Sequence, residues 1–236
     1  MFKVSEIYKS FHAKKSPVLS GISFSIDKGE TVALVGENGA GKTTLIRILS
    51  QILKPDQGFF SFDNIKFNAD PGYLKSKTGT LFSGDGLLYD RLSAKENILY
   101  HAELNGILKT KYNKMLEILV DELSLSDFLN DRVSTFSRGM KQRTSIARTL
   151  ITDPDFVMLD EPSNGLDIIA VESVKKIIKR LKDSGKTVLF SSHNVDEIFN
   201  CASRIIVINK GKITCDKTLE SFLSKHGKDL TFYIKE

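Results

Sequence analysis

The sequence has few cysteines and no long hydrophobic run. Its two cysteines, Cys201 and Cys215, show neither CxxC spacing nor a neighbouring histidine pattern. We therefore expect reduced core thiols of a cytosolic protein rather than a disulfide or a metal site. No apolar stretch reaches the ~18 residues that a membrane-spanning helix needs, and the first residues, MFKVSEIYKSF, lack the apolar segment of a signal peptide. We expect no membrane insertion, so a role at a membrane would depend on another chain.

Internal repeats, low-complexity tracts and an obvious flexible linker are also missing. Hydrophobic residues make up 41% and charged residues 27% of the 236 residues, which is ordinary globular usage and is enough to bury a sizeable core. The net charge is +5, but the basic residues are scattered, and the cluster VKKIIKRLK (174–182) is more typical of a solvated helix face than of a nucleic-acid patch. We therefore expect one large domain (1–236) and no nucleic-acid partner.

Hydrophobic patterning predicts strands and helices that alternate at both ends of the chain. Alternating or continuous apolar runs predict strands at 22–27, 31–36, 59–64, 79–83, 155–162, 187–192 and 204–215. Helical spacing predicts helices at 42–53, 93–107, 111–125, after Ser137, and at 171–185. The helix at 93–107 opens with a capping box of Ser93 and Glu96. The pattern predicts an α/β core with a parallel sheet, formed by residues 1–83 and 155–236, that carries an inserted helical subdomain at 84–154.

The segment GENGAGKTT (36–44) fits the phosphate-loop pattern G-x-x-x-x-G-K-[ST] between a predicted strand and a predicted helix. Its glycines let backbone N–H groups point at phosphate oxygens, and the helix N-terminus adds partial positive charge. Lys42 can bind the β and γ phosphates, and the Thr43 hydroxyl can ligate Mg²⁺. The alternative, a chance glycine-rich turn, fits this strand–loop–helix context poorly. The candidate nucleotide-binding residues here are Gly36, Asn38, Gly39, Ala40, Gly41, Lys42, Thr43 and Thr44.

A second candidate element is FVMLDE (156–161), four apolar residues followed by two carboxylates. A buried strand would deliver Asp160 at its carboxyl end, beside the phosphate loop, where it can hold Mg²⁺ through the water shell of the ion. Glu161 would then polarise a water for in-line attack on the γ phosphate. The alternative is an ordinary strand-end turn with two solvated acids.

A third candidate element lies in VSTFSRGMKQR (133–143), where Ser137 and Gly139 stand at the start of a predicted helix. A serine cap and a glycine that allows close approach suit an anion-binding helix terminus. The surrounding sequence offers no partner group for such a site, so the origin of the anion stays open at this point.

These elements together resemble the ATP-binding subunit of the ABC transporter family over essentially the whole chain. GENGAGKTT resembles the family's Walker A motif, FVMLDE its Walker B motif, and SRGMKQ its signature, commonly Leu-Ser-Gly-Gly-Gln. SNGLD (163–167) resembles the D-loop and SSH (191–193) the switch histidine. The resemblance implies a P-loop NTPase core, with a RecA-like parallel sheet and an antiparallel β subdomain, and an inserted α-helical subdomain. It also implies hydrolysis of ATP with Mg²⁺.

The resemblance further implies that two subunits stack head to tail and share their ATP sites. Ser137 and the Gly139 backbone N–H would then bind an ATP held by the partner's Walker A, and Asp167 would bridge to that motif. His193 would contact the γ phosphate, although a lone histidine is otherwise more often a satisfied core residue. Phe11 stands where the family places an aromatic residue against adenine, with Tyr8 as the alternative.

Two departures from the family pattern stand out. The family normally has a glutamine at the end of the strand GTLFS (79–83), where this chain has Ser83, so contact of this residue with the metal would need a bridging water. The candidate metal residues are Thr43, Asp160 and Ser83. In the signature, Arg138 and Met140 replace the commonest residues, and this variant resembles the branch that pairs with separate exporter-type membrane subunits.

The sequence therefore indicates an ATPase that energises a separate transmembrane permease from the cytoplasmic face of the membrane. We expect a second, identical ATPase subunit as partner and export as the direction of transport. One alternative is a soluble ABC-type ATPase of the cofactor-assembly kind. Another is a different P-loop enzyme, a small-molecule kinase or GTPase, against which Glu161 and the SRGMKQ and SNGLD segments argue.

Overall fold

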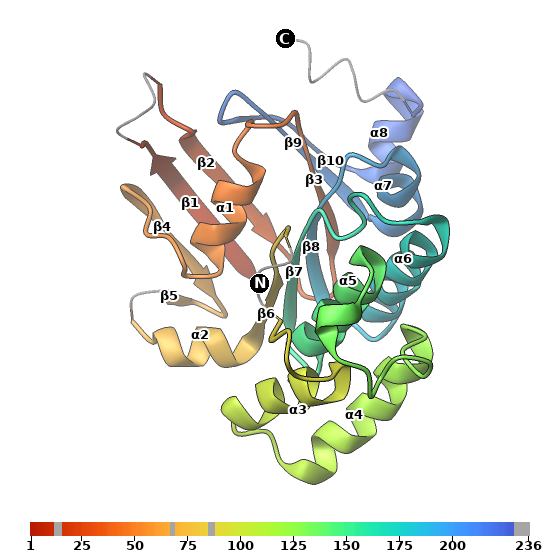
Figure 1. The fold of residues 1–236 in the computed structure, drawn as a ribbon. Coiled ribbons are helices and arrows are strands. Elements are labelled where there is room, and N and C mark those ends of the chain that lie inside the picture. The colour runs from red at the N-terminus through yellow and green to blue at the C-terminus, as the bar shows by residue number, and fades with distance from the viewer. Residues whose placement is uncertain (12–15, 67–68, 85–87, 229–236) are drawn as a thin grey trace.

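Two β-sheets form the body of the chain (Figure 1). The computed structural model describes residues 1–11, 16–66, 69–84 and 88–228. The smaller sheet is antiparallel, with the order β2-β1-β4-β5. Its strands are β1 (Phe2–Lys9), β2 (Leu19–Ile26), β4 (Gln57–Phe62) and β5 (Ile65–Lys66). It supplies the predicted antiparallel β subdomain.

The larger sheet has the order β10-β9-β3-β8-β7-β6, and only the β10–β9 pair is antiparallel. Its strands are β3 (Thr31–Val35), β6 (Thr78–Leu81), β7 (Phe156–Asp160), β8 (Thr187–Ser191), β9 (Arg204–Asn209) and β10 (Lys212–Thr218). Every residue of β3, β7 and β8 is buried. Continuous apolar runs are typical of parallel strands covered on both faces, and the predicted parallel core is confirmed.

Alternate residues of β3 belong to two different hydrophobic cores. Val32 and Leu34 pack with the smaller sheet and with helix α1 (Lys42–Leu49), whereas Ala33 and Val35 pack with the helices on the other face. This division follows from the two-residue period of a strand. Figure 1 shows α1 between the two sheets. The loop that joins β3 to α1 follows the last residue of β3, so it lies at the carboxyl edge of the parallel strands.

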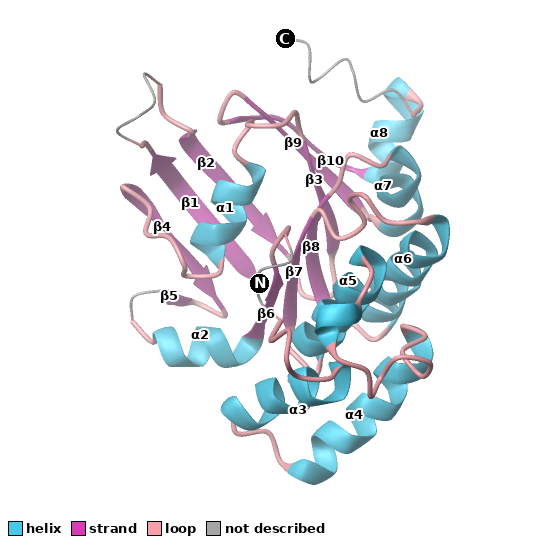
Figure 2. Cartoon of the chain, in the orientation of Figure 1, coloured by secondary structure: helices cyan, strands magenta, loops and turns pink. Residues whose placement is uncertain are grey.

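Helices α5 (Arg138–Leu150), α6 (Ile168–Asp183) and α8 (Leu219–His226) pack on the outer face of the larger sheet, and α7 (Val195–Cys201) packs beside α6 (Figure 2). The helices α3 (Ala94–Leu104) and α4 (Lys109–Glu122) pack on α5 and α6 instead, beyond the sheet, and the 3₁₀ turn Val133–Thr135 precedes α5. The capping box predicted for α3 is present, with the Ser93 hydroxyl accepting from the Glu96 N–H and the Glu96 carboxylate accepting from the Ser93 N–H. Helix α2 (Pro71–Lys77), by contrast, packs on β6.

The predicted segment 204–215 is a hairpin rather than one strand. Lys210 and Gly211 form its two-residue loop, both with positive φ (46° and 77°), which matches the twist of antiparallel strands. Cys201 and Cys215 are both buried and do not form a disulfide. Among the described residues, no helix combines the length and apolar character needed to cross a membrane.

Candidate functional site

The loop between β3 and α1 leaves a helix N-terminus open at the sheet edge. Gly36 and Gly41 have φ values of +157° and +115°, and a Cβ at Gly36 would lie 2.2 Å from the carbonyl oxygen of Ile208. Neither position tolerates a side chain, so the backbone itself forms this surface. Gly41 caps α1 without a side-chain hydrogen bond, which leaves first-turn N–H groups available to an anion. A cavity of about 130 Å³ here is lined by Val18, Asn38, Gly39, Gly41, Lys42, Thr43, Thr44 and Glu161.

The ammonium group of Lys42 is buried at the base of this loop. Its Nζ donates to the carbonyl oxygens of Gly36 (2.7 Å) and Glu37 (3.1 Å), and it lies 3.8 Å from Glu161 Oε1. Burial lowers the pKa of Lys42, and the negative charges of Glu161 and Asp160 oppose that shift. A phosphate group would therefore have to draw Lys42 away from two loop carbonyls.

Asp160 ends β7 fully buried and accepts hydrogen bonds from three hydroxyl groups. Its Oδ1 accepts from Thr43 (3.2 Å) and Ser191 (2.8 Å), and its Oδ2 accepts from Ser83 (3.0 Å). The structure thus brings together the three residues predicted for the metal, although Ser83 touches Asp160 directly. This oxygen-rich donor set fits Mg²⁺. Because no described residues form a cluster of three or more His, Cys, Asp or Glu side chains, the ion would also need phosphate and water ligands.

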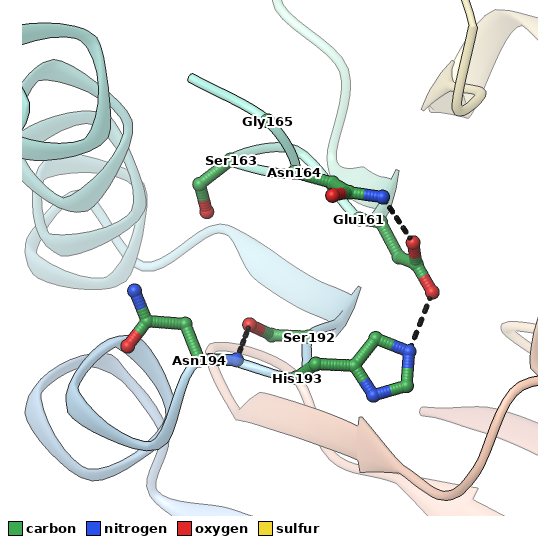
Figure 3. A pocket seen from close by; sticks show the side chains of 7 residues that line it. All are labelled: Glu161, Ser163, Asn164, Gly165, Ser192, His193 and Asn194. Carbon is green, nitrogen blue, oxygen red and sulfur yellow. Dashed lines mark hydrogen bonds and ion pairs between the residues drawn. The ribbon is translucent and has the colours of Figure 1, made fainter. Parts of the chain in front are cut away.

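Glu161 stands at the start of the next turn, with its carboxylate held between two side chains (Figure 3). Its φ is +49°, and its N–H donates to Ser191 Oγ at 2.9 Å. Oε2 accepts from Asn164 Nδ2 at 2.9 Å, and Oε1 lies 2.9 Å from His193 Nε2. The surrounding cavity of about 300 Å³ is lined by Glu161, Ser163, Asn164, Gly165, Ser192, His193 and Asn194.

His193 Nε2 also lies 3.2 Å from Lys42 Nζ. One ring nitrogen cannot accept from the ammonium group and donate to Glu161 at the same time, so only one of the two contacts can be a hydrogen bond in a given protonation state. Lys42 and Glu161 therefore compete for the same ring nitrogen of His193 at the mouth of the phosphate loop.

Ser137 and Gly139 lie away from this cavity. The Ser137 hydroxyl caps α5 by accepting from the Met140 N–H at 3.2 Å, and Gly139 is buried near Asp167. Asp167 caps α6, since its Oδ1 accepts from the Ala170 N–H at 2.8 Å. Neither Ser137 nor Gly139 lines the phosphate-loop cavity of its own chain.

The aromatic candidates lie on the β1–β2 hairpin. Phe11 is 39% exposed, and Lys9 Nζ lies 5.7 Å above its ring. Tyr8 is similarly exposed, and its hydroxyl contacts Glu6 instead. Val18, on the same hairpin, lines the phosphate-loop cavity and was not predicted, because an isolated valine carries no sequence signal.

Sequence reasoning also missed the polar partners of the two carboxylates, namely Ser191 and Asn164. Ser191 is the last residue of β8, and Asn164 lies in the loop that follows β7, both at the carboxyl edge of the parallel sheet. Polar residues at that position are a usable signal, because ligands of open α/β sheets bind there.

Comparison with known proteins connects this site to one family. The family model described as ABC transporter matches residues 19–164. The ABC transporter ATP-binding protein NatA of Bacillus subtilis is 38% identical over 235 residues, covering 98% of this chain and 96% of that protein. The linearmycin resistance ATP-binding protein LnrL of Bacillus subtilis is 30% identical over 225 residues, covering 95% and 72%. The xylose/arabinose import ATP-binding protein XylG of Sulfolobus acidocaldarius is 33% identical over 226 residues, covering 93% of this chain and 89% of that protein.

A solved structure with this fold contains the reaction products of ATP hydrolysis. It is described as a dimeric structure of a post-hydrolysis state of the ATP-binding cassette MJ0796 bound to ADP and Pi. The TM-score is 0.83 at 27% identity, with 93% of this chain and 99% of that chain covered.

Proposed function

This chain belongs to the ABC transporter family as an ATP-binding subunit that hydrolyses ATP, and from this premise we propose which residues bind and cleave ATP and what the hydrolysis drives. The phosphates lie along the loop Gly36–Gly41 and the first turn of α1, and Lys42 leaves its two carbonyl partners to bind the β and γ phosphates. Thr43, Asp160 and Ser83 would hold Mg²⁺ directly or through water. When bound, Mg²⁺ neutralises phosphate charge and polarises the γ phosphate.

Glu161 is the general base in this proposal. The observation that carries it is the position of the Glu161 carboxylate, 3.8 Å from Lys42 Nζ, hydrogen-bonded to Asn164 and 2.9 Å from His193 Nε2. A carboxylate oriented on both sides at the mouth of a phosphate loop can accept a proton from an attacking water. Binding of the γ phosphate frees His193 from Lys42 and lets its ring contact the phosphate.

Each subunit supplies half of an ATP site. Ser137 and Gly139 lie outside their own phosphate-loop cavity and present a helix N-terminus to a second molecule, which is the arrangement that a shared site requires. The dimeric ADP-bound relative supports this proposal. Two identical subunits would close on two ATP molecules, and hydrolysis would reopen them. Asp167, beside Gly139, would bridge to the partner.

A transmembrane permease is the second partner. Between α2 and β6 on one side and α3 and α5 on the other lies a groove of about 370 Å³, with the exposed Ile52 in its lining. The exposed Leu104 and Leu108 are chain neighbours of its lining residues Asn105 and Ile107. Lys75 and Arg148 add positive charge to its lining. These features fit a short amphipathic helix with an acidic residue, supplied by the permease. The predicted subdomains 1–83 with 155–236 and 84–154 would move against each other across this groove.

Export is the proposed direction. The subunit would lie on the cytoplasmic face of the membrane, where its substrate ATP is available. The signature variant and a resistance protein among the relatives support it. Transport measured in inverted vesicles that contain the permease checks the direction, because an exporter moves its substrate into such vesicles in an ATP-dependent way.

Substitution of the general base tests the proposed chemistry. Glu161→Gln should lower ATP turnover by about 10²–10⁴-fold, the usual contribution of a general base, while ATP still binds and dimers persist. Phosphate release measures turnover, and light scattering measures the dimer. Turnover at the wild-type rate would reject Glu161 as the base.

A further inference from the structure

A second carboxylate lies fully buried beneath the site. Glu197, in the first turn of α7, is 0% exposed. Its Oε1 accepts from the Ser163 hydroxyl at 2.6 Å, and its Oε2 accepts from the Ser192 hydroxyl at 2.5 Å. Burial of an ionised carboxylate is costly unless its oxygens are hydrogen-bonded, and here each oxygen has its own hydroxyl donor.

The two serines occupy equivalent places with respect to Glu161. Ser163 directly precedes Asn164, which donates to Glu161 Oε2, and Ser192 directly precedes His193, which contacts Glu161 Oε1. Figure 3 shows both segments converging on Glu161. The buried carboxylate of Glu197 therefore anchors the two backbone segments whose side chains contact the carboxylate of Glu161.

We infer that Glu197 is a positioning residue for ATP hydrolysis, which keeps Asn164 and His193 in register around Glu161 by anchoring Ser163 and Ser192. The inference rests on the proposed role of Glu161 and deepens it. Glu197 itself lines neither of the two cavities of the site, so it acts only through its serine partners.

Hydrogen bonding to Glu197 also opposes the effect of its burial. Burial raises the pKa of Glu197, and the hydroxyls of Ser163 and Ser192 and the charge of Lys175 lower it. Both serines can donate only while the carboxylate is ionised. In Glu197→Gln one oxygen becomes an NH₂ group, which donates, while the side-chain volume is kept. The serine that faces this group can no longer donate to residue 197 and has to accept from it instead.

A purely structural role is the competing explanation. An acidic side chain in the first turn of a helix stabilises that helix, and its loss would lower stability without a selective effect on turnover. The experiment must therefore separate turnover from ATP affinity and from stability.

Three variants test the inference: Glu197→Gln, Ser163→Ala and Ser192→Ala. Each should lower kcat at saturating MgATP by roughly 10–100-fold, the range seen when residues that orient catalytic ligands are replaced, while the Kd for ATP stays unchanged. The matched control is Ser203→Ala. Ser203 makes two hydrogen bonds to the Thr31 backbone at the opposite edge of the sheet, so its loss should leave kcat unchanged.

A double-mutant cycle distinguishes a positioning role of these residues from a purely structural one. Because Ser192 acts through His193, Ser192→Ala should cause no further loss of kcat in a His193→Ala background. A further loss there would overturn the inference, and so would an equal loss of kcat in the Ser203→Ala control or a parallel loss of ATP affinity. If Glu197→Gln fails to fold, the two serine variants decide.

Failure of the inference and failure of the proposed function give different results. Wild-type turnover in all three variants, together with impaired Glu161→Gln, overturns the role of Glu197 alone. Wild-type turnover in Glu161→Gln overturns the proposed base itself.

Discussion

Contact between Arg138 and Gly165 makes the signature region sensitive to a single methyl group. Gly165 lies in the loop that follows Glu161 and has a φ of +69°. A Cβ at this position would lie 2.3 Å from Arg138 Nη1 and 2.7 Å from Arg138 Cζ. Gly165→Ala must therefore strain the backbone and displace the guanidinium group that covers this loop.

Two contributions to the loss of stability add up in Gly165→Ala. A left-handed conformation costs an L-residue roughly 1–2 kcal/mol. Displacement of a contacting side chain adds about 0.5 kcal/mol or more. Gly185 isolates the first contribution, since its φ is +74° and a Cβ there would meet nothing within 4 Å. At roughly 2–4 °C per kcal/mol for a chain of this size, Gly185→Ala should lower Tm by about 2–8 °C, and Gly165→Ala by at least ~1–2 °C more.

Thermal and urea unfolding of four variants measures the difference: Gly165→Ala, Gly185→Ala, Arg138→Ala and the double variant of Gly165 and Arg138. In the Arg138→Ala background, Gly165→Ala should cost only as much as Gly185→Ala does in the wild type. The packing argument is refuted if Gly165→Ala destabilises no more than Gly185→Ala, or if its extra cost persists without Arg138.

Two further predictions concern nucleotide binding. Ser137→Arg should leave ATP binding to the single subunit intact but abolish ATP-driven dimerisation in light scattering. The control Ser93→Ala, which removes the cap of another helix, should dimerise normally. A closed dimer of Ser137→Arg would contradict the shared site. Phe11→Ala should raise the Kd for ATP roughly 5- to 150-fold, the effect of losing about 1–3 kcal/mol of base stacking, with kcat at saturation less affected; an unchanged Kd in isothermal titration calorimetry would put the adenine contact elsewhere.

Patterning failed where the backbone departs from its regular period. In β1 the pairing register shifts between Val4 and Ile7, where Glu6 has a φ of +49°. The alternation of buried and exposed side chains is interrupted there, so Phe2, Val4 and Ile7 do not follow one two-residue period. The residues of β1 therefore lack a clear strand pattern. Helix α2 was missed because it is short and buries only Leu74.

Contiguous motifs are the part of this protein that the sequence by itself determined. The phosphate loop, the carboxylates after β7 and the capped start of α5 are each a few adjacent residues whose backbone requirements are local. The three fully buried strands β3, β7 and β8 were equally predictable, because burial on both faces demands continuous apolar residues. The order of these motifs also sufficed to indicate the family and its fold class.

Contacts between distant segments were decided only by the tertiary structure. The hydroxyls of Thr43, Ser83 and Ser191 surround Asp160 because β6, β7, β8 and the loop after β3 end at the same sheet edge. The anchoring of two site segments by Glu197 likewise depends on how α7 packs beneath them. Short-range conformational preferences specify a loop or a cap, whereas side chains far apart in sequence meet only through strand order and helix packing, which single-sequence patterns leave open.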